Sequence, residues 1–581
     1  MSRMTPQRLA TSTVAAILEG YRTYRTYFQD ITSRALERFV RCDWSGIQDD
    51  AVERLEAYQK ILVEVVAELA DRLEDRSDDP AFWTEAKTCF AAAMDQVSDP
   101  DLAETFFNSV VRRLANIIGA DPRIEFVRDA PRPLPIPKAE RDYQTFTAAG
   151  RPLEELCRMI LEASPLADGF QDIRRDARLM AAHLDRHHRI AESQHPLPVV
   201  MAHVDMIPTP FFRGMGAYLI GRRVTAGGEI HPLAIALVND EKGIRLDGII
   251  DDTEGIRLLF SYTHSYFHVH TDHLLELIAF LHPLLPHRRL AELYISLGFN
   301  RHGKTELYRD LARHQNACRD IFDISPGKPG MVMAVFNMPS DDLVFKVIRD
   351  HFAQPKRTTR REVMAKYAYI FRHDRTGRLP DTQTFEHLKF ECGCFHPRLL
   401  RELQETASRS VEIDASDVAI ALAYVERRVH PLDLYLAEAS SEAARTAVID
   451  FGQAIKDLAY SNLFPGDMLV KNFGVTGLGR VIFYDFDEIC PLTDCRFRRK
   501  PRAVSLEDEL SSEPWYYVAE NDIFPEEFEH FLGLTGPLRE VFMQHHGDLL
   551  SVDFWRRTQE KIRTGDPIHV FPYNRFAPDS E

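Results

Sequence analysis

The residues best suited to catalysis lie in the stretch 464–488. Asp467 and Asn472 are spaced as D-x-x-x-x-N, and the apolar run 481–484 ends on Asp485. In phosphoryl transfer, an aspartate in such a loop accepts the proton of the substrate hydroxyl, and the asparagine binds Mg²⁺. A carboxylate at the end of a strand then binds a metal ion that bridges the nucleotide phosphates. The pattern predicts a hairpin that brings Asp467 and Asp485 to one cleft for this chemistry.

A lysine within an apolar strand is the second candidate for phosphate chemistry. Residues 331–336 and 343–348 predict a two-stranded hairpin, and Lys346 lies in its second strand. A lysine among buried residues is uncommon unless it meets an anion. Protein kinases pair a strand lysine with the nucleotide phosphates beneath a glycine-containing loop. An edge-strand lysine that faces solvent is the alternative, and Glu362, in a later helical run, is a candidate partner for Lys346.

A different phosphate site would use Lys304. Gly298, Gly303, Lys304 and Thr305 fit G-x-x-x-x-G-K-[ST], between a strand-like run, 293–297, and a helix-like run, 306–314. Such a loop holds phosphates on backbone N–H groups, with the lysine on the terminal phosphates and the threonine on Mg²⁺. No series of parallel βαβ units surrounds the motif, so the alternative is a helix start beside a domain junction.

Two further patterns resemble metal sites. The segment 268–273 reads His-Val-His-Thr-Asp-His, as in metallo-β-lactamase-type hydrolases, but the repeated βα units with further ligands are missing. A strand followed by a helix start is the alternative. The second pattern is a possible zinc site formed by Cys392, Cys394, His396, Cys490 and Cys495. Buried free thiols are the favoured alternative, because the spacing of these cysteines is unusual for zinc ligands.

Composition limits the class of protein. A chain of 581 residues exceeds what one hydrophobic core supports, so more than one domain is expected. The net charge of −17 argues against a nucleic-acid partner. No long apolar run or signal peptide is present, and the scattered cysteines do not form a disulfide framework. The sequence predicts a cytoplasmic protein that binds neither nucleic acid nor membrane.

The pattern of apolar residues changes along the chain. Helices are predicted where apolar residues recur every three or four positions, at 13–28, 51–73, 103–118 and 274–281. Strands are predicted where β-branched and aromatic residues gather, at 217–220, 233–238, 244–250 and 257–269. Helices return at 525–547 and 552–562. Residues 1–318 therefore form a mostly helical domain with a β insert.

Several motifs after residue 320 together resemble the isocitrate dehydrogenase kinase/phosphatase family, whose chain length also matches. They are Ser325-Pro-Gly-Lys-Pro-Gly-Met331, Val344-Phe-Lys346-Val, Gly377-Arg-Leu-Pro-Asp381-Thr, Glu426-Arg-Arg-Val-His-Pro-Leu, Pro465-Gly-Asp467-Met-Leu and Tyr484-Asp-Phe-Asp487-Glu. The resemblance implies an α+β fold with a protein-kinase-like bilobal catalytic domain at 319–581, behind a regulatory domain at 1–318. The N-lobe would span about 319–425 and the C-lobe about 426–581.

The resemblance also implies a function. Members phosphorylate a serine of isocitrate dehydrogenase with ATP and Mg²⁺ (or Mn²⁺) and remove the phosphate at the same site. They thereby control flux between the tricarboxylic acid cycle and the glyoxylate bypass. AMP or ADP is the expected effector, and AMP bound between the domains favours the phosphatase direction. Isocitrate dehydrogenase is the implied partner, and a homodimer is left open.

Site residues follow from the resemblance by position. The nucleotide would be bound by Ser325, Pro326, Gly327, Lys328, Pro329, Gly330, Met331 and Lys346. Asp467 would be the base of the catalytic loop, and Asn472 and Asp485 the metal ligands. Asp381 would be the phosphatase carboxylate. Lys471 and Asp487 would line the same cleft.

The chain departs from ordinary kinases at several points. Gly327 and Gly330 do not form G-x-G-x-x-G, 464–466 stands where His-Arg would precede the aspartate, and Asp487 stands where DFG has glycine. The specialised family shows this pattern. Two other functions are left open: a P-loop NTPase that uses 298–305, and a catalytically inactive, nucleotide-gated binding module.

Overall fold

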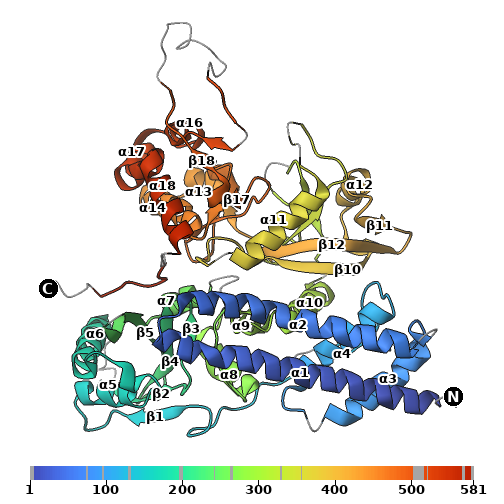
Figure 1. The fold of residues 1–581 in the computed structure, drawn as a ribbon, viewed down its shortest axis with the longest axis horizontal. Helices are drawn as coiled ribbons and strands as arrows, with labels where there is room; N and C mark the ends of the chain where they lie inside the picture. Colours follow the sequence, from blue (N-terminus) through green and yellow to red (C-terminus); the bar gives the residue numbers. More distant parts are fainter. Residues whose placement is uncertain are drawn as a thin grey trace.

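The computed structural model describes residues 5–73, 76–94, 97–128, 132–194, 200–240, 242–261, 266–318, 320–326, 330–354, 356, 358–373, 375–501, 516–519, 521–565 and 570–576. Its two parts follow the sequence: the first half of the chain forms the lower part in Figure 1, and the second half forms the upper part. Among the described residues, no helix combines the length and the apolar character needed to cross a membrane.

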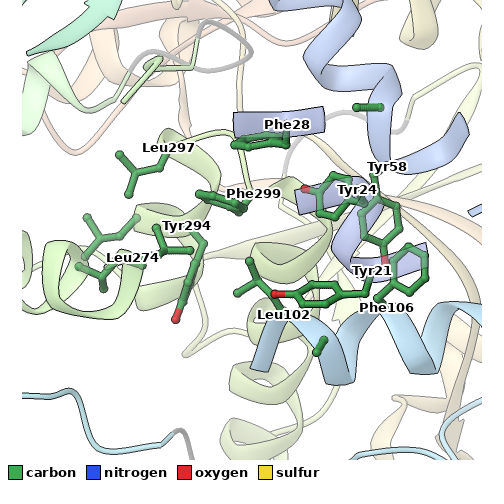
Figure 2. Packing of buried hydrophobic residues seen from close by; sticks show 14 of the residues in the cluster. Tyr21, Tyr24, Phe28, Tyr58, Leu102, Phe106, Leu274, Tyr294, Leu297 and Phe299 are labelled. Carbon is green, nitrogen blue, oxygen red and sulfur yellow. The ribbon is translucent and has the colours of Figure 1, made fainter. Parts of the chain in front are cut away.

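Long helices begin the N-terminal part, as predicted. They are α1 (Pro6–Val40), α2 (Trp44–Leu73), α3 (Pro80–Ala93) and α4 (Pro100–Leu114). Proline at the first helical position starts α1, α3 and α4, where its missing N–H costs nothing. Aromatic residues from one face of α1 enter the core, where Tyr24 lies 5.0 Å from Tyr58 of α2 and Phe28 lies 4.7 Å from Phe299, between ring centroids (Figure 2).

An antiparallel sheet follows, with strand order β1–β2–β4–β5–β6 and with β3 paired to β4. Its strands are β1 (Gln144–Thr147), β2 (Met201–Met206), β3 (Phe211–Arg213), β4 (Gly216–Thr225), β5 (Ile230–Asp240) and β6 (Gly243–Ile250). Three of the four predicted strands fall in β4, β5 and β6. Helices α5 (Leu153–Glu162) and α6 (Ile173–Gln194) share a buried apolar cluster with this sheet.

The predicted strand at 257–269 is wrong, because helix α7 (Thr253–Leu259) occupies its first part. The Asp252 side chain caps this helix by accepting a hydrogen bond from Gly255 N at 2.7 Å. Residues 262–265 of the predicted strand lie outside the described residues. The apolar residues Ile256 and Leu259 enter the core from a helix rather than a strand.

Three helices close the N-terminal part: α8 (Leu274–Leu281), α9 (Leu290–Ser296) and α10 (Asn300–Cys318). The first confirms the helix predicted at 274–281, whereas the strand predicted at 293–297 is wrong. Helix α9 stands in its place, and the Glu292 carboxylate in its first turn accepts a hydrogen bond from Arg289 N at 3.2 Å.

The C-terminal part begins with a second antiparallel sheet, in the order β10–β12–β9–β8–β7, with β11 paired to β12. Its elements are β7 (Asp323–Ile324), β8 (Met333–Asn337), β9 (Leu343–Ile348), α11 (Arg360–His373), β10 (Gln383–Glu391), α12 (Pro397–Thr406), β11 (Val411–Ile413) and β12 (Asp417–Arg427). The hairpin predicted around Lys346 is confirmed as β8 and β9, which pair from Met333–Ile348 to Asn337–Val344.

A mostly helical lobe completes the chain, with short strands that carry the site. Its helices are α13 (Leu432–Glu438), α14 (Ser441–Tyr460), α16 (Phe528–Phe531), α17 (Gly536–His546) and α18 (Val552–Thr564). Its strands are β13 (His430–Pro431), β14 (Leu463–Phe464), β15 (Phe473–Val475), β16 (Val481–Phe483), β17 (Cys490–Pro491), β18 (Arg496–Phe497) and β19 (Asp522–Ile523). A small sheet-containing lobe before a helical lobe confirms the expected kinase-like fold.

Ion pairs and the returning C-terminal segment join the N-terminal and C-terminal parts of the molecule. Arg289 bonds Asp341 at 2.7 Å, and Arg427 at the end of β12 pairs with Glu292 at 2.6 Å. The C-terminal segment 570–576 returns to the N-terminal part, near α7 in Figure 1. There Arg575 donates two hydrogen bonds of 2.8 Å to the buried carboxylate of Asp247.

Candidate functional site

The predicted metal ligands lie at the ends of the hairpin β15–β16, with Asn472 before its first strand and Asp485 after its second. Asn472 directly precedes β15, and its backbone oxygen accepts a hydrogen bond from Tyr484 N at 3.1 Å, so Asp485 follows the residue paired with Asn472. The Asn472 Nδ2 group donates to the backbone oxygen of Asp467 at 3.2 Å, and Asp467 Oδ1 accepts from Leu469 N at 3.1 Å. The structure confirms the predicted hairpin, and Asn472 links it to the loop of Asp467 and to Tyr484, the residue before Asp485.

A close backbone approach fixes the loop that carries Asp467. Gly466 has φ of +75°, and a Cβ atom there would lie 2.6 Å from the backbone oxygen of Glu488. Strand β14 also pairs with β17, with Phe464 opposite Cys490. Position 466 therefore requires glycine, because of its positive φ and the close approach of the Glu488 oxygen. The loop that carries Asp467 packs against the segment that follows Asp487.

Lys346 lies at the junction of the two lobes. Its side chain is buried, and its ammonium group forms an ion pair with Glu426 of β12 and donates to the backbone oxygen of Tyr484 at 2.9 Å. Strands β9 and β12 are antiparallel neighbours with Lys346 opposite Tyr424, which brings Glu426 within reach. The lysine thus touches the residue next to Asp485, and the edge-strand alternative is wrong.

The predicted pairing of Glu362 with Lys346 is wrong. Glu362 lies in the first turn of α11, where its carboxylate accepts from Thr359 N at 2.7 Å and Glu362 N donates back to Thr359 Oγ1. This capping box uses the glutamate to start the helix. Helix α11 reaches the site instead through Lys366, which donates a hydrogen bond to the backbone oxygen of Asp487.

Asp381 is next in sequence to a residue that bonds Glu426, but its own carboxylate has a different hydrogen-bond partner. The next residue, Thr382, donates to Glu426 Oε2 at 3.0 Å, whereas the Asp381 carboxylate accepts from Gln383 Nε2 at 2.8 Å. Burial raises the pKa of Asp381 to about 6, aided by the charge of Glu292 and opposed by Arg288 and Arg427. Strand β10 begins at Gln383, so the alternative role of Asp381 as a helix cap is wrong.

Asp487 is the second site carboxylate whose pKa is raised. Burial and the neighbouring charge of Asp485 raise the pKa of Asp487 to about 6, although Lys356 lies 3.9 Å from its carboxylate. The aromatic residue between the two aspartates, Phe486, contacts Tyr367 of α11 with ring centroids 5.1 Å apart. Helix α11 therefore supports the segment 485–487 by packing and by hydrogen bonding.

The proposed nucleotide loop is described only in part, because Gly327, Lys328 and Pro329 lie outside the described residues. Ser325 donates its hydroxyl to Asn337 Oδ1 at 2.7 Å, which ties the start of the loop to β8. The backbone oxygen of Gly330 accepts from Arg349 Nε at 3.1 Å. Pro326 and Met331 are exposed, as is Lys471 on the opposite lobe.

A buried arginine positions both Asp381 and Asp485. Arg378 donates to Asp450 and Asp457 at 2.7–2.8 Å and to the backbone oxygen of Val481 at 2.9 Å. Its own backbone oxygen accepts from Phe483 N at 2.8 Å. The segment 377–381 is thereby attached to β16, two residues before Asp485.

Asn472 and Asp485 fit a divalent cation. The Asn472 Nδ2 group is engaged with the backbone of the loop, which leaves its Oδ1 as the atom available to a cation. Asp485 Oδ1 accepts only a long contact, 3.4 Å from Asp487 N, among the described residues. Hard oxygen ligands in this small number suit Mg²⁺, which takes its remaining ligands from phosphates and water.

The P-loop interpretation is wrong. The motif lies at the turn between α9 and α10, so Gly303, Lys304 and Thr305 are helical and no strand precedes them. The Gly303 N–H already donates to Phe299 O at 2.9 Å, and Thr305 Oγ1 donates to Arg301 O. Burial, with the charge of Arg301, lowers the pKa of Lys304 to about 7, and its ammonium lies 5.0 Å from the centroid of the Phe385 ring.

Neither predicted metal pattern forms a cluster of ligands in the described part of the chain. His268 is buried, its backbone pairs with Phe212, and burial lowers the pKa of its imidazole well below the usual range. Cys392 and Cys394 belong to a short turn, and Cys490 and Cys495 are a separate pair of free thiols.

Sequence reasoning missed the residues that complete the site from other elements. Glu426, Thr382 and Lys366 each bond to a predicted site residue or to its partner. Glu426 was inside a recognised motif, at the end of a strand rich in β-branched and aliphatic residues, which is the only local signal for it. The pairing itself depends on which strands are neighbours.

Comparisons with known proteins identify the family. The family model for the isocitrate dehydrogenase kinase/phosphatase (AceK) kinase domain matches residues 320–575, and the model for the regulatory domain matches residues 14–319. A protein named isocitrate dehydrogenase kinase/phosphatase from Anaeromyxobacter sp. (strain Fw109-5) is 45% identical over 571 residues, which cover 98% of each chain.

Two further relatives of the same name extend the comparison. That of Anaeromyxobacter dehalogenans (strain 2CP-C) is 43% identical over 97% of each chain. That of Xanthomonas campestris pv. campestris (strain 8004) is 39% identical over 98% of this chain and 97% of its own. With both family models matched in order and relatives aligned over nearly the full length, this chain belongs to the isocitrate dehydrogenase kinase/phosphatase family.

Proposed function

We propose that this protein phosphorylates isocitrate dehydrogenase on a serine with ATP and removes the phosphate at the same site. The observation that carries the proposal is the contact of Lys346 with Glu426 and with the backbone of Tyr484. This contact joins the phosphate-binding lysine to the hairpin of Asn472 and Asp485. Membership of a kinase/phosphatase family and an assembled set of kinase residues argue against both a P-loop NTPase and an inactive binding module.

The forward reaction needs positioning and charge neutralisation more than covalent help. Lys346 would hold the phosphates of ATP, and Asn472 and Asp485 would hold Mg²⁺ or Mn²⁺. When bound, the cation neutralises charge on the phosphate oxygens. Asp467, on the loop that β14 and Gly466 fix, would accept the proton of the substrate serine as the serine oxygen bonds to the γ-phosphorus, and the bond from that phosphorus to ADP would break. Lys471 and Asp487 would line the same cleft.

The reverse reaction would add Asp381. Its pKa of about 6 lies close to neutral pH. A general base is most effective when its pKa is near the pH at which the enzyme works. Asp381 would orient the water or nucleotide that accepts the phosphate and, where the acceptor is water, take up its proton. The bond between phosphorus and the serine oxygen would break, and Asp467 would return a proton to that oxygen. Because Thr382 bonds Glu426, the partner of Lys346, this carboxylate stands one residue from the shared nucleotide site.

The metabolic role, the cellular location and the effector are also proposals. The substrate dehydrogenase and the family point to control of flux between the tricarboxylic acid cycle and the glyoxylate bypass, in the cytoplasm. AMP or ADP would act as the effector that shifts the balance between the two activities. The ion pairs of Arg289 and Arg427 across the two parts offer a physical route for such an effect.

The test is incubation with isocitrate dehydrogenase and labelled ATP, followed by a chase with unlabelled nucleotide. We expect label on a serine of the dehydrogenase and its later release. Lys346→Ala and Asp485→Asn should each reduce labelling by about 100-fold or more, whereas Lys304→Ala should have little effect. No labelling by wild-type protein, or a larger loss from Lys304→Ala than from Lys346→Ala, would refute the proposal.

A second comparison separates the two directions. Asp381→Ala should keep most of the labelling activity and lose the release of phosphate. Asp467→Ala should lose both if one cleft serves both directions. Equal loss of both activities in a folded Asp381→Ala protein would remove the specific role of Asp381.

A further inference from the structure

Two cysteine thiols meet directly after the predicted catalytic segment. Cys490 lies in β17, and Cys495 follows the short turn η7 (Leu492–Asp494). Their Sγ atoms are 3.6 Å apart, and neither cysteine takes part in a disulfide. Cys490 is partly exposed, whereas Cys495 is buried. Since a disulfide needs an S–S distance of about 2 Å, a small approach of the two sulfurs would suffice.

The loop 490–495, called the thiol loop below, is anchored firmly at its Cys495 end. Gln559 of α18 donates its amide to the backbone oxygens of Leu492 and Cys495 at 2.7 and 2.8 Å. Asn462 bonds Leu492 N through its backbone oxygen and Thr493 N through its side chain. We expect the Cys490 end, which is held by backbone pairing with β14, to move as the sulfurs approach each other.

The Cys490 end is attached to both aspartate-bearing segments of the site. Cys490 pairs with Phe464, which lies three residues before Asp467. Cys490 also lies three residues after Asp487, and the intervening Glu488 presents its backbone oxygen to Gly466. A displacement of Cys490 is thus transmitted to Asp467 through β14 and to Asp487 along the chain.

The surroundings distinguish the two thiols chemically. The contact with the Cys495 thiol lowers the pKa of Cys490, and the positive charge of Lys366 acts in the same direction, although burial opposes both. The same contact, together with burial, raises the pKa of Cys495. Because the thiolate is the nucleophile, Cys490 is the sulfur that attacks an oxidant first.

We propose that Cys490 and Cys495 form a reversible disulfide on reaction with a hydroperoxide, and that this bond switches off the adjacent site. The Cys490 thiolate displaces hydroxide from hydrogen peroxide and becomes a sulfenic acid. The Cys495 sulfur then displaces the sulfenic oxygen, which leaves as water with the thiol proton. In total, two thiols are oxidised by two electrons, one peroxide is reduced to two waters, and a dithiol reductant reverses the step.

The test treats the full-length protein with hydrogen peroxide and maps its peptides without reduction by mass spectrometry. We expect a Cys490–Cys495 cross-link and at least a tenfold loss of ATP-dependent labelling of isocitrate dehydrogenase, both reversed by dithiothreitol. Cys495→Val should retain the activity of the reduced protein and resist peroxide. The matched control, Cys392→Ser with Cys394→Ser, should remain sensitive.

The outcomes separate this inference from the function on which its activity readout rests. If the reduced wild-type protein does not label the dehydrogenase, the proposed function fails, while the cross-link is still tested by mass spectrometry. Absence of the cross-link, or full activity in cross-linked protein, would overturn the switch. Should Cys495→Val prove unstable, Cys490→Ser serves the same purpose, and peroxide sensitivity equal to wild type in either variant would also overturn it.

Discussion

At the scale of single residues, the Lys346–Glu426 ion pair is the first contact to examine. Both side chains are buried, so removing one charge leaves the other without compensation. We expect Glu426→Ala to lower the free energy of unfolding by about 3–5 kcal/mol, measured by urea denaturation. Glu362→Ala is the matched control: it removes only an exposed helix cap and should cost about 1 kcal/mol. A larger cost for Glu362→Ala would show that the exposed residue is the structural partner.

Asp381 should make stability depend on pH. Burial raises its pKa from 3.8 to about 6, so the folded protein holds this proton more tightly than the unfolded chain. The carboxyl group therefore favours folding below about pH 4, and that contribution is lost as the pH rises through 6. Asp381→Asn should be more stable than wild type at pH 8, with a smaller difference at pH 5, by urea denaturation at each pH. Lower stability of Asp381→Asn at pH 8 would mean that the arginines nearby outweigh burial.

The same residue should shape the pH profile of the phosphatase. If Asp381 takes up a proton, the rate of phosphate release should rise between pH 5 and pH 7 with an apparent pKa near 6. The measurement is release of label from phosphorylated isocitrate dehydrogenase over that range. Asp381→Asn should have a low rate without this rise. An unchanged rise in Asp381→Asn would assign it to another group, such as Asp487.

At the scale of elements, Arg378 attaches the loop of Asp381 to α14 and β16. Its guanidinium is buried against two carboxylates and a backbone oxygen. Arg378→Met should lower the free energy of unfolding by about 3–5 kcal/mol, because Asp450 and Asp457 would be left without their partner. Arg158→Ala, which removes an exposed pair within α5, should cost less than about 1 kcal/mol. Equal costs would show that the three-way bridge is not needed to hold the loop.

At the scale of the whole molecule, the C-terminal segment ties the helical lobe to the N-terminal sheet. Arg575 and Tyr573 both bond the buried carboxylate of Asp247 on β6. A Cβ atom at Gly248 would lie 2.6 Å from the Tyr573 ring, so glycine permits this close approach. The segment therefore holds together two parts that are far apart in sequence.

Loss of this tie is the prediction at that scale. Arg575→Ala should lower the free energy of unfolding by about 1–2 kcal/mol, since hydrogen bonds to a charged group are lost. Limited proteolysis should also cleave the linked parts faster. Arg499→Ala, at an exposed pair with Asp553, is the control and should change stability by less than about 0.5 kcal/mol. No difference between the two variants would show that the segment contributes nothing to the assembly.

The sequence alone determined the local features of the site. Asp467, Asn472, Asp485 and Lys346 could be predicted as candidates because each lies beside or within a short strand, where the spacing of residues indicates which of them a hairpin brings together. The N-terminal helices were found for a similar reason, since a buried face repeats every three or four residues. These features depend on neighbours within a few residues along the chain.

Tertiary structure decided the remaining features. Glu426 replaced Glu362 as the partner of Lys346 because strand order, not separation in sequence, places β12 beside β9. The motif of Lys304 became a helix because the bond from Arg289 N to Glu292 at the start of α9 and the close packing of Gly303 against Ala291 favour α9 and α10 over a strand and loop. Contacts between distant segments depend on packing of the whole chain, which no local pattern of residues records.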